Sequence, residues 1–290
     1  NIKSPFFFFF KPKKIMKRIL VPTDFSKHAE EALKSAVQIA KKNGSEIFLL
    51  HLLELPHQLH DAMTNGSSIP EVMLFIKKAH EKLQKIKEQP HLQGITISTT
   101  VQFERAFDGI LSFNKKNNID LIVMGSSGSS GIEEMLIGSN TEKVVRLSDI
   151  PVLVVKKDLD TFNIKNIVFA SDFTKEIKKP FLKMIEFANI FDANLALVMI
   201  CTPNSFKTTA IAEKTMKDFI ADFEVKNYSI NIYNDSNIEK GIRNFTNTIG
   251  ADLIGLCTHG RTGMSHFFNG SIGEDLVNPS TKPEKTFHIT

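Results

Sequence analysis

The feature that most constrains the fold of this chain is an internal repeat. Residues 18–26 (RILVPTDFS) return 148 positions later as residues 166–174 (NIVFASDFT), and residues 46–53 return at the same spacing as 194–201. Residues 119–125 return as 251–257, so the spacing falls to 132 and sixteen extra residues lie between 54 and 95 of the first copy. A repeat of this length is typical of a duplicated unit, and 290 residues leave room for two domains. We therefore expect one domain over 16–157 and a second over 158–290.

Residues 1–15 differ in character from the rest, and we expect them to be a disordered or non-native leader. They contain four lysines and no acid, which accounts for the formal net charge of +4 of the whole chain. Residues 16–290 therefore have a formal net charge of zero. This argues against a large nucleic-acid surface, which needs clustered lysine and arginine. The run Phe6–Phe10 is too short for a membrane span of about 20 residues, and no membrane partner is expected.

The overall composition is that of an ordinary folded protein, with 42% hydrophobic and 23% charged residues. The chain contains two cysteines, Cys201 and Cys257, which are too few for a disulfide framework or for a zinc site made of cysteines alone. This cysteine usage favours a reducing, cytoplasmic location.

The hydrophobic periodicity predicts an α/β fold. Short apolar runs alternate with segments of helical period, and three of the runs are apolar at nearly every position, as strands covered on both faces are. Ser26 precedes the first helix, Gly44 follows it, and another helix begins near Pro70. We expect two tandem open parallel five-stranded sheets with helices on both faces. In the first copy the expected strands are 18–22, 46–53, 95–101, 120–125 and 152–155, and the expected helices are 27–42, 71–88, 105–117 and 139–148.

Two segments follow expected strands at the edge where open parallel sheets bind ligands. Residues 22–24 (PTD) follow the first strand, and residues 125–131 (GSSGSSG) follow the fourth, with 138–141 (GSNT) at the next helix start. Glycines and free amides at a helix N-terminus suit a phosphate. The alternatives are that Asp24 or Ser26 only caps a helix and that the glycine segment is a flexible surface loop. No Gly-x4-Gly-Lys-[Ser/Thr] is present and no Gly-x-Gly-x2-Gly follows the first strand, which argues against a Walker-type loop and a dinucleotide fold.

These motifs resemble the universal stress protein family. The resemblance rests on residues 22–24, on the spacing Gly125-x2-Gly128-x9-Gly138-Ser139, and on residues 150–155 (IPVLVV). The second copy adds residues 258–263 (THGRTG) and Gly270-Ser271. The resemblance implies a tandem member of the family with a Rossmann-like fold of the adenine-nucleotide alpha-hydrolase type.

The same resemblance implies that ATP is bound, with Mg²⁺ or Mn²⁺ as an optional partner of the phosphates. It places the adenine and ribose near Thr23, Asp24, the backbone of Leu52, Met124 and Gly125, and the phosphates near the amides of Gly128, Gly138, Ser139 and Asn140. A weaker second site would use Asp172, Gly260, Gly270 and Ser271. We expect that site to be degraded or empty, because Cys257 replaces the glycine found at position 125 and its side chain would crowd a nucleotide.

No catalytic group is evident in the sequence. His57, His60 and Asp61 lie in the inserted segment, and Glu133 and Glu134 lie in the glycine segment, where all are better explained as surface residues. His51 and His259 have no visible partner base or nucleophile. We expect little or no ATP hydrolysis, and therefore a nucleotide-dependent switch or sensor in a stress response. The alternative is a nucleotide-free dimerisation or interaction module whose glycine loops are structural. An enzyme of the alpha-hydrolase group is disfavoured, since residues 22–26 do not provide the Ser-Gly-Gly-x-Asp-Ser loop such an enzyme needs.

The expected last strand of each copy predicts how the copies associate. Residues 152–155 are apolar and would be a liability as a bare edge. In relatives this strand pairs across a domain interface, so we expect it to pair with residues 286–289 and form a pseudo-dimer within the chain. A homodimer of two chains is a further expectation.

Overall fold

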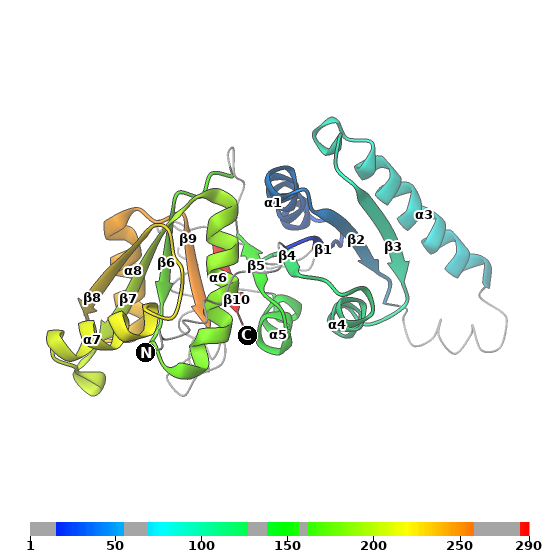
Figure 1. Ribbon diagram of the computed structural model, residues 1–290. Coiled ribbons are helices and arrows are strands. Elements are labelled where there is room, and N and C mark those ends of the chain that lie inside the picture. The colour runs from blue at the N-terminus through cyan, green and yellow to red at the C-terminus, as the bar shows by residue number, and fades with distance from the viewer. Residues whose placement is uncertain (1–15, 55–68, 127–137, 157–161, 258–284, 290) are drawn as a thin grey trace, which may run out of the picture.

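The structure is a computed structural model, and it describes residues 16–54, 69–126, 138–156, 162–257 and 285–289. Each half of the chain alternates strands and helices (Figure 1). The first half contains β1 (Arg18–Pro22), α1 (Lys27–Asn43), β2 (Glu46–Leu52), α3 (Ile69–Lys87), the 3-10 helix η1 (Pro90–Leu92), β3 (Ile97–Gln102), α4 (Ala106–Asn117), β4 (Leu121–Gly125), α5 (Ser139–Leu147) and β5 (Val152–Val155). The second half contains β6 (Asn166–Ala170), η2 (Lys175–Ile177), α6 (Lys178–Phe191), β7 (Asn194–Cys201), η3 (Pro203–Ser205), α7 (Thr209–Ile220), β8 (Tyr228–Asn234), α8 (Ile238–Ile249), β9 (Leu253–Cys257) and β10 (Lys285–Ile289).

The described strands form one sheet of ten, in the order β3-β2-β1-β4-β5-β10-β9-β6-β7-β8. Every pairing is parallel except the pairing of β5 with β10, which is antiparallel. The predicted α/β class and parallel strands are therefore confirmed. The two five-stranded sheets are joined edge to edge through β5 and β10, so each half covers one edge strand of the other.

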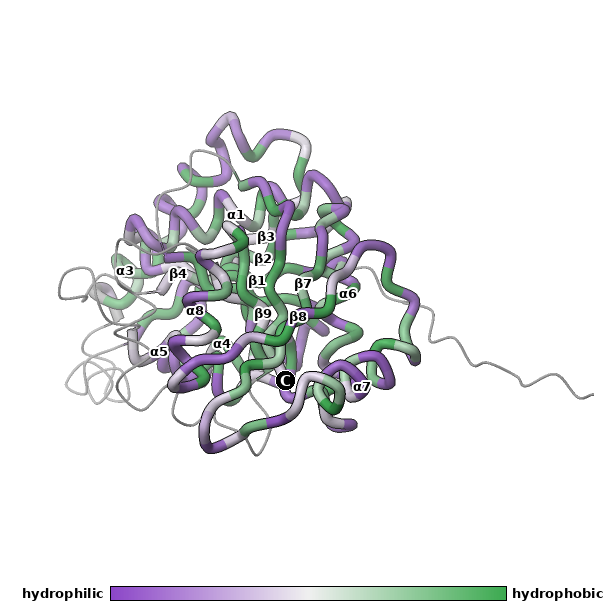
Figure 2. The backbone as a smooth tube through the Cα atoms, turned by 90° about the vertical axis from the view of Figure 1, so that its left-hand side faces the viewer, coloured by the Kyte–Doolittle hydropathy of each residue, from purple (hydrophilic) through white to green (hydrophobic). Residues whose placement is uncertain are grey.

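The helices cover both faces of the sheet, and the core differs between the faces. On one face a single hydrophobic cluster includes side chains of α1, α3, α6 and α7 and runs through both halves. On the other face, α4 and α5 pack over one cluster and α8 packs over another. Figure 2 shows apolar strands through the middle of the molecule and hydrophilic stretches on the outer helices. The strands are therefore buried on both faces, as their apolar sequences predict.

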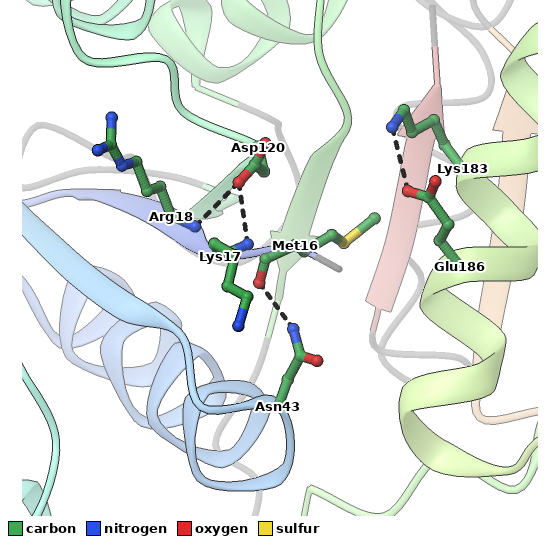
Figure 3. Close-up of polar contacts among 7 residues, drawn as sticks. All are labelled: Met16, Lys17, Arg18, Asn43, Asp120, Lys183 and Glu186. Carbon is green, nitrogen blue, oxygen red and sulfur yellow. Dashed lines mark hydrogen bonds and ion pairs between the residues drawn. The ribbon is translucent and has the colours of Figure 1, made fainter. Parts of the chain in front are cut away.

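The repeat extends to tertiary contacts. The Asp120 carboxylate, just before β4, accepts the backbone amides of residues 17 and 18 at 2.9 and 3.1 Å (Figure 3). Asp252, just before β9, accepts the amides of residues 165 and 166 at 2.8 and 2.9 Å. Each acid ties the start of one inner strand to the start of its neighbour, so the repeated Asp-Leu-Ile sequence has a structural cause.

The expected helix ends are also present. The Ser26 hydroxyl accepts the Ala29 amide at 3.2 Å and caps α1, and Gly44 ends this helix with a φ of 66°. The helix expected near Pro70 begins at Ile69. None of the described helices is long and apolar enough to cross a membrane.

Candidate functional site

A pocket of about 300 Å³ lies at the carboxyl ends of β1, β2 and β4. This is the point where the strand order of the first half reverses, because β1 lies between β2 and β4. The pocket walls come from the ends of these strands, from α1 and α4, and from the first turn of α5. The lining residues are Pro22, Thr23, Asp24, Ala29, Leu50, Leu52, Glu54, Ala106, Ile110, Met124, Gly125, Gly138, Ser139, Asn140 and Thr141. The sequence-predicted residues of the first site that the structure describes are thus brought together here, and Gly128 lies outside the described residues.

A tight turn after β1 presents Asp24 to the pocket. The Thr23 hydroxyl accepts the Phe25 amide at 3.1 Å, and the Asp24 carboxylate accepts the Ser26 amide at 3.0 Å. Phe25 has a φ of 65°, a left-handed conformation that is uncommon for a bulky residue. Ser26, rather than Asp24, caps α1. The Asp24 carboxylate is therefore held by the turn while it faces the pocket.

His51 supports this turn from the neighbouring strand. Its Nδ1 lies 2.8 Å from the Thr23 carbonyl oxygen, which can only accept, so the ring donates this hydrogen bond. The ring also packs against Phe25, with centroids 4.4 Å apart, and the Lys82 ammonium lies 4.7 Å from the centre of the Phe25 ring. Burial is the main cause that lowers the pKa of His51, with the charge of Lys82 a lesser one. The neutral imidazole is thus a structural support for the turn.

Gly125 permits close packing at the end of β4. A Cβ atom built there would lie 2.7 to 2.8 Å from Cβ, C and O of His28 in the first turn of α1. This distance is shorter than ordinary contacts between such atoms, so a side chain at 125 would force α1 away. The glycine expected to serve the ligand therefore also serves the packing of α1 against β4.

The N-terminus of α5 forms the wall beside β4. Gly138 is its N-cap and provides no side-chain cap. The Gly138 amide donates to the Ser126 carbonyl at 2.7 Å, and the Thr141 hydroxyl donates to the Gly125 carbonyl at 2.9 Å. These bonds hold the helix start against β4. Because the first amides of a helix have no partner within it, those of α5 are available at the pocket.

Sequence reasoning missed several pocket residues, most notably Glu54, Ala106 and Ile110. Leu50, Leu52 and Glu54 are two residues apart at and just beyond the end of β2, so the two-residue period of a strand would have placed them on one face. Ala106 and Ile110 come from α4, which packs against β2 and α5. No local motif marks those two positions.

The second half differs at the equivalent positions. Cys257 ends β9 as Gly125 ends β4, and its thiol is buried. Burial raises the pKa of the Cys257 thiol to about 12, and the negative charge of Asp172 contributes. The charge of Asp172 therefore acts on the Cys257 thiol at the end of β9. Gly260, Gly270 and Ser271 lie outside the described residues, so the weaker second site stays a prediction.

Metal binding receives no support from the described parts of the chain, where no group of three or more His, Cys, Asp or Glu side chains is placed to hold an ion. His57, His60, Asp61, Glu133 and Glu134 lie outside those parts, and so does His259. The expectation of Mg²⁺ or Mn²⁺ at the phosphates stays a prediction.

The fold and the pocket define a Rossmann-like α/β protein with a crevice at the strand-order switch. A family model described as the universal stress protein family matches residues 16–156. A universal stress protein of Methanocaldococcus jannaschii is 34% identical over 144 residues, which cover 49% of this chain and 84% of the relative. The chain belongs to the universal stress protein family.

Two further relatives align with both halves of the chain. A universal stress protein of Synechocystis is 22% identical, and the alignment covers 94% of this chain and 100% of the relative. The crystal structure of a universal stress protein from Archaeoglobus fulgidus superposes with a TM-score of 0.69 at 21% identity, and the match covers 94% of this chain and 96% of that one. The latter similarity shows a shared two-half fold.

Proposed function

We propose that this protein binds ATP in the pocket of its first half and acts as a nucleotide-dependent switch or sensor in a stress response, with little or no hydrolysis. The observation that carries the proposal is the pairing of apolar side chains on one side of the pocket, such as Leu52 and Ile110, with the amide-bearing start of α5 at the switch point. The apolar side chains suit a base, and the helix N-terminus suits a phosphate.

The order of the groups along the pocket suits a nucleotide. Leu52 and Ile110 lie at the β2 and α4 side, whereas Gly138 and Ser139 lie at the α5 side. The groups offered to the phosphates are backbone amides and hydroxyls, which hold charge in place. Hydrolysis also requires a positioned water and a group that stabilises the charge of the transition state. We therefore expect ATP to stay bound and to act through binding.

The test compares nucleotide bound by the wild-type protein and by Gly138→Val. Residue 138 has a φ of −60° and a ψ of 142°, so valine fits the backbone and adds bulk at the N-cap of α5, on the pocket wall. Purified proteins are denatured, and released ATP or AMP is identified by mass spectrometry; the Kd for ATP is then measured by calorimetry. We expect nucleotide from the wild type and a Kd raised at least about tenfold in the variant, the loss of roughly one charge-assisted hydrogen bond.

The matched control is Ala210→Val, an exposed position in the first turn of α7. It adds the same side chain at a helix start in the second half, and we expect an unchanged Kd. If denatured Gly138→Val and denatured wild type released equal amounts of nucleotide, this would contradict the proposed site and favour the nucleotide-free interaction module. The switch is tested separately, by protease cleavage within residues 126–138 with and without saturating ATP. An unchanged cleavage rate would contradict the switch and leave the binding site standing.

A further inference from the structure

Glu54 lies on the pocket wall just beyond β2, with its carboxylate already oriented. Its Oε1 accepts the backbone amide of Ala106, the first residue of α4, at 2.7 Å. Both residues line the pocket. The N-cap residue of α4 is Arg105, which provides no side-chain hydrogen bond, so Glu54 caps this helix from a different element. One carboxylate oxygen is thus committed to the helix, and this bond fixes where the carboxylate lies.

The second half caps the equivalent helix by other means. The Asn237 side chain, at the N-cap of α8, accepts the Lys240 amide at 2.8 Å. Thr202 stands at the position equivalent to Glu54, and its hydroxyl bonds to Ser205 within the same loop. A local cap is therefore sufficient for this fold. In the first half the cap is instead a charged group that also faces the pocket.

The charge of Glu54 decides which part of a nucleotide it can face. Phosphates would be repelled by a carboxylate, and they are served by the α5 amides on another wall. A carboxylate takes hydrogen bonds from donors such as hydroxyl groups. In dinucleotide-binding sheets, an acidic side chain about 20 residues beyond the glycine turn accepts a hydrogen bond from a ribose hydroxyl. This chain lacks that glycine turn after its first strand, but Glu54 offers the same acidic group on the pocket wall, two residues beyond the end of β2.

We propose that Glu54 accepts a hydrogen bond from a ribose hydroxyl of the bound nucleotide and makes the site selective for nucleotides whose sugar carries that hydroxyl. This inference rests on the proposed function. It assigns two roles to one side chain: Oε1 caps α4, and Oε2 accepts the hydrogen bond from the ribose hydroxyl. The pocket would then discriminate against nucleotides that lack both ribose hydroxyls, because they cannot make this charge-assisted hydrogen bond.

The experiment combines a change in the protein with a change in the ligand. Glu54→Gln keeps an oxygen for the Ala106 amide but removes the charge and the second acceptor. Calorimetry measures the Kd of ATP and of 2′,3′-dideoxy-ATP for the wild type and the variant. We expect the wild type to bind ATP about 10- to 100-fold more tightly than the dideoxy analogue, as for one hydrogen bond to a charged group. In Glu54→Gln that preference falls to about one, while the Kd of the analogue is unchanged.

The analogue distinguishes a lost contact from a damaged pocket, because a damaged pocket would weaken both ligands. Glu104→Gln is the matched control, since Glu104 accepts the Ser112 hydroxyl at 2.9 Å and does not line the pocket. We expect it to keep the wild-type preference. A wild type that binds both ligands equally, or a Glu54→Gln variant that keeps the preference, would overturn the role of Glu54 and leave ATP binding standing. A wild type that binds neither ligand would overturn the proposed function.

Discussion

The identity of one residue separates the two halves at the end of their fourth strands. Glycine at 125 lets α1 approach β4, whereas cysteine at 257 stands at the end of β9. The helix after the first strand of each half also differs, because α1 begins at Lys27, directly after its cap, while α6 is preceded by the 3-10 turn η2 and begins at Lys178. In the first half, therefore, α1 can begin directly after its cap because residue 125 has no side chain to clash with its first turn.

This link predicts the effect of Gly125→Cys. The new side chain would overlap His28 and displace the start of α1, which forms one wall of the pocket. We expect the free energy of unfolding to fall by about 1–3 kcal/mol, as for other overpacked sites, and the Kd for ATP to rise at least about tenfold, as for a lost charge-assisted hydrogen bond. Urea unfolding and calorimetry measure the two effects. Cys257→Ala is the reciprocal control and should leave the Kd unchanged; ATP binding at wild-type affinity by Gly125→Cys would show that the pocket is misassigned.

The residues of the pocket divide by how far the sequence could predict them. Thr23, Asp24 and Gly138 follow strands or precede a helix within a recognisable local pattern, so the sequence alone predicted that they lie at the ligand-binding edge of the sheet. Glu54 and Ala106 meet only because β2 ends and α4 begins at the same edge of the sheet. That meeting depends on tertiary packing, which no single segment encodes.

At the scale of elements, four of the helices that the structure describes end in a left-handed residue, and two of those four residues are glycine. Gly44 and Gly250 have φ values of 66° and 60°, while Asn118 and Asp192 have 50° and 52°. Sequence reasoning identified Gly44 because glycine is the usual residue there. Strand ends were predicted to within one or two residues: β3, for example, starts at Ile97 rather than 95, because its ladder with β2 begins at Ile47. Such ends are set by the neighbouring strand.

These helix ends predict changes in stability of opposite sign. Gly44→Ala places a side chain at positive φ with nothing within 4 Å of it, so strain is the main cost. We expect a loss of about 1 kcal/mol, and the same loss for the matched Gly250→Ala, which has equally open surroundings. Asp192→Gly relieves the strain and should gain up to about 1 kcal/mol. The urea midpoint at unchanged slope measures each effect; a stabilising Gly44→Ala would contradict this account.

At the scale of the whole molecule, the junction of β5 and β10 makes the two halves one structure. Residues 152–155 pair with residues 285–288, which confirms the predicted pairing but begins one residue earlier than the expected 286–289. On one face, Phe187 of α6 and Phe287 of β10 stack with centroids 4.4 Å apart, within the cluster that also contains Leu153 and Met16. Figure 3 shows the Met16 side chain extending from the start of β1 toward the second half. The apolar edge strand and the resemblance predicted the strand pairing, but the core shared between the halves depends on side chains from both.

The same junction predicts how stability depends on pH. His288 on β10 is fully buried, with its Nε2 3.0 Å from the Thr286 hydroxyl, and burial, then the charge of Lys156, lowers its pKa to about 3. Above about pH 6.5 the imidazole is neutral in both the folded and the unfolded chain, so the full stability is present. As the pH falls below that value the unfolded chain takes up a proton that the folded chain excludes, and the free energy of unfolding falls by about 1.4 kcal/mol per pH unit for this group.

His288→Gln removes this proton uptake while keeping an amide that can reach Thr286. Urea unfolding between pH 7 and pH 5 should therefore show a shallower loss of stability in the variant than in the wild type. Below pH 6 the two slopes should differ by about 1.4 kcal/mol per pH unit, the contribution of one proton. His51→Gln is the comparison: because His51 is only half-buried, we expect its substitution to flatten the profile over a narrower range of pH. Parallel profiles for the wild type and His288→Gln would mean that the imidazole takes up its proton in the folded chain as well. The junction would then have to open to water around β10 without the protein unfolding, which contradicts a core that is continuous across the two halves.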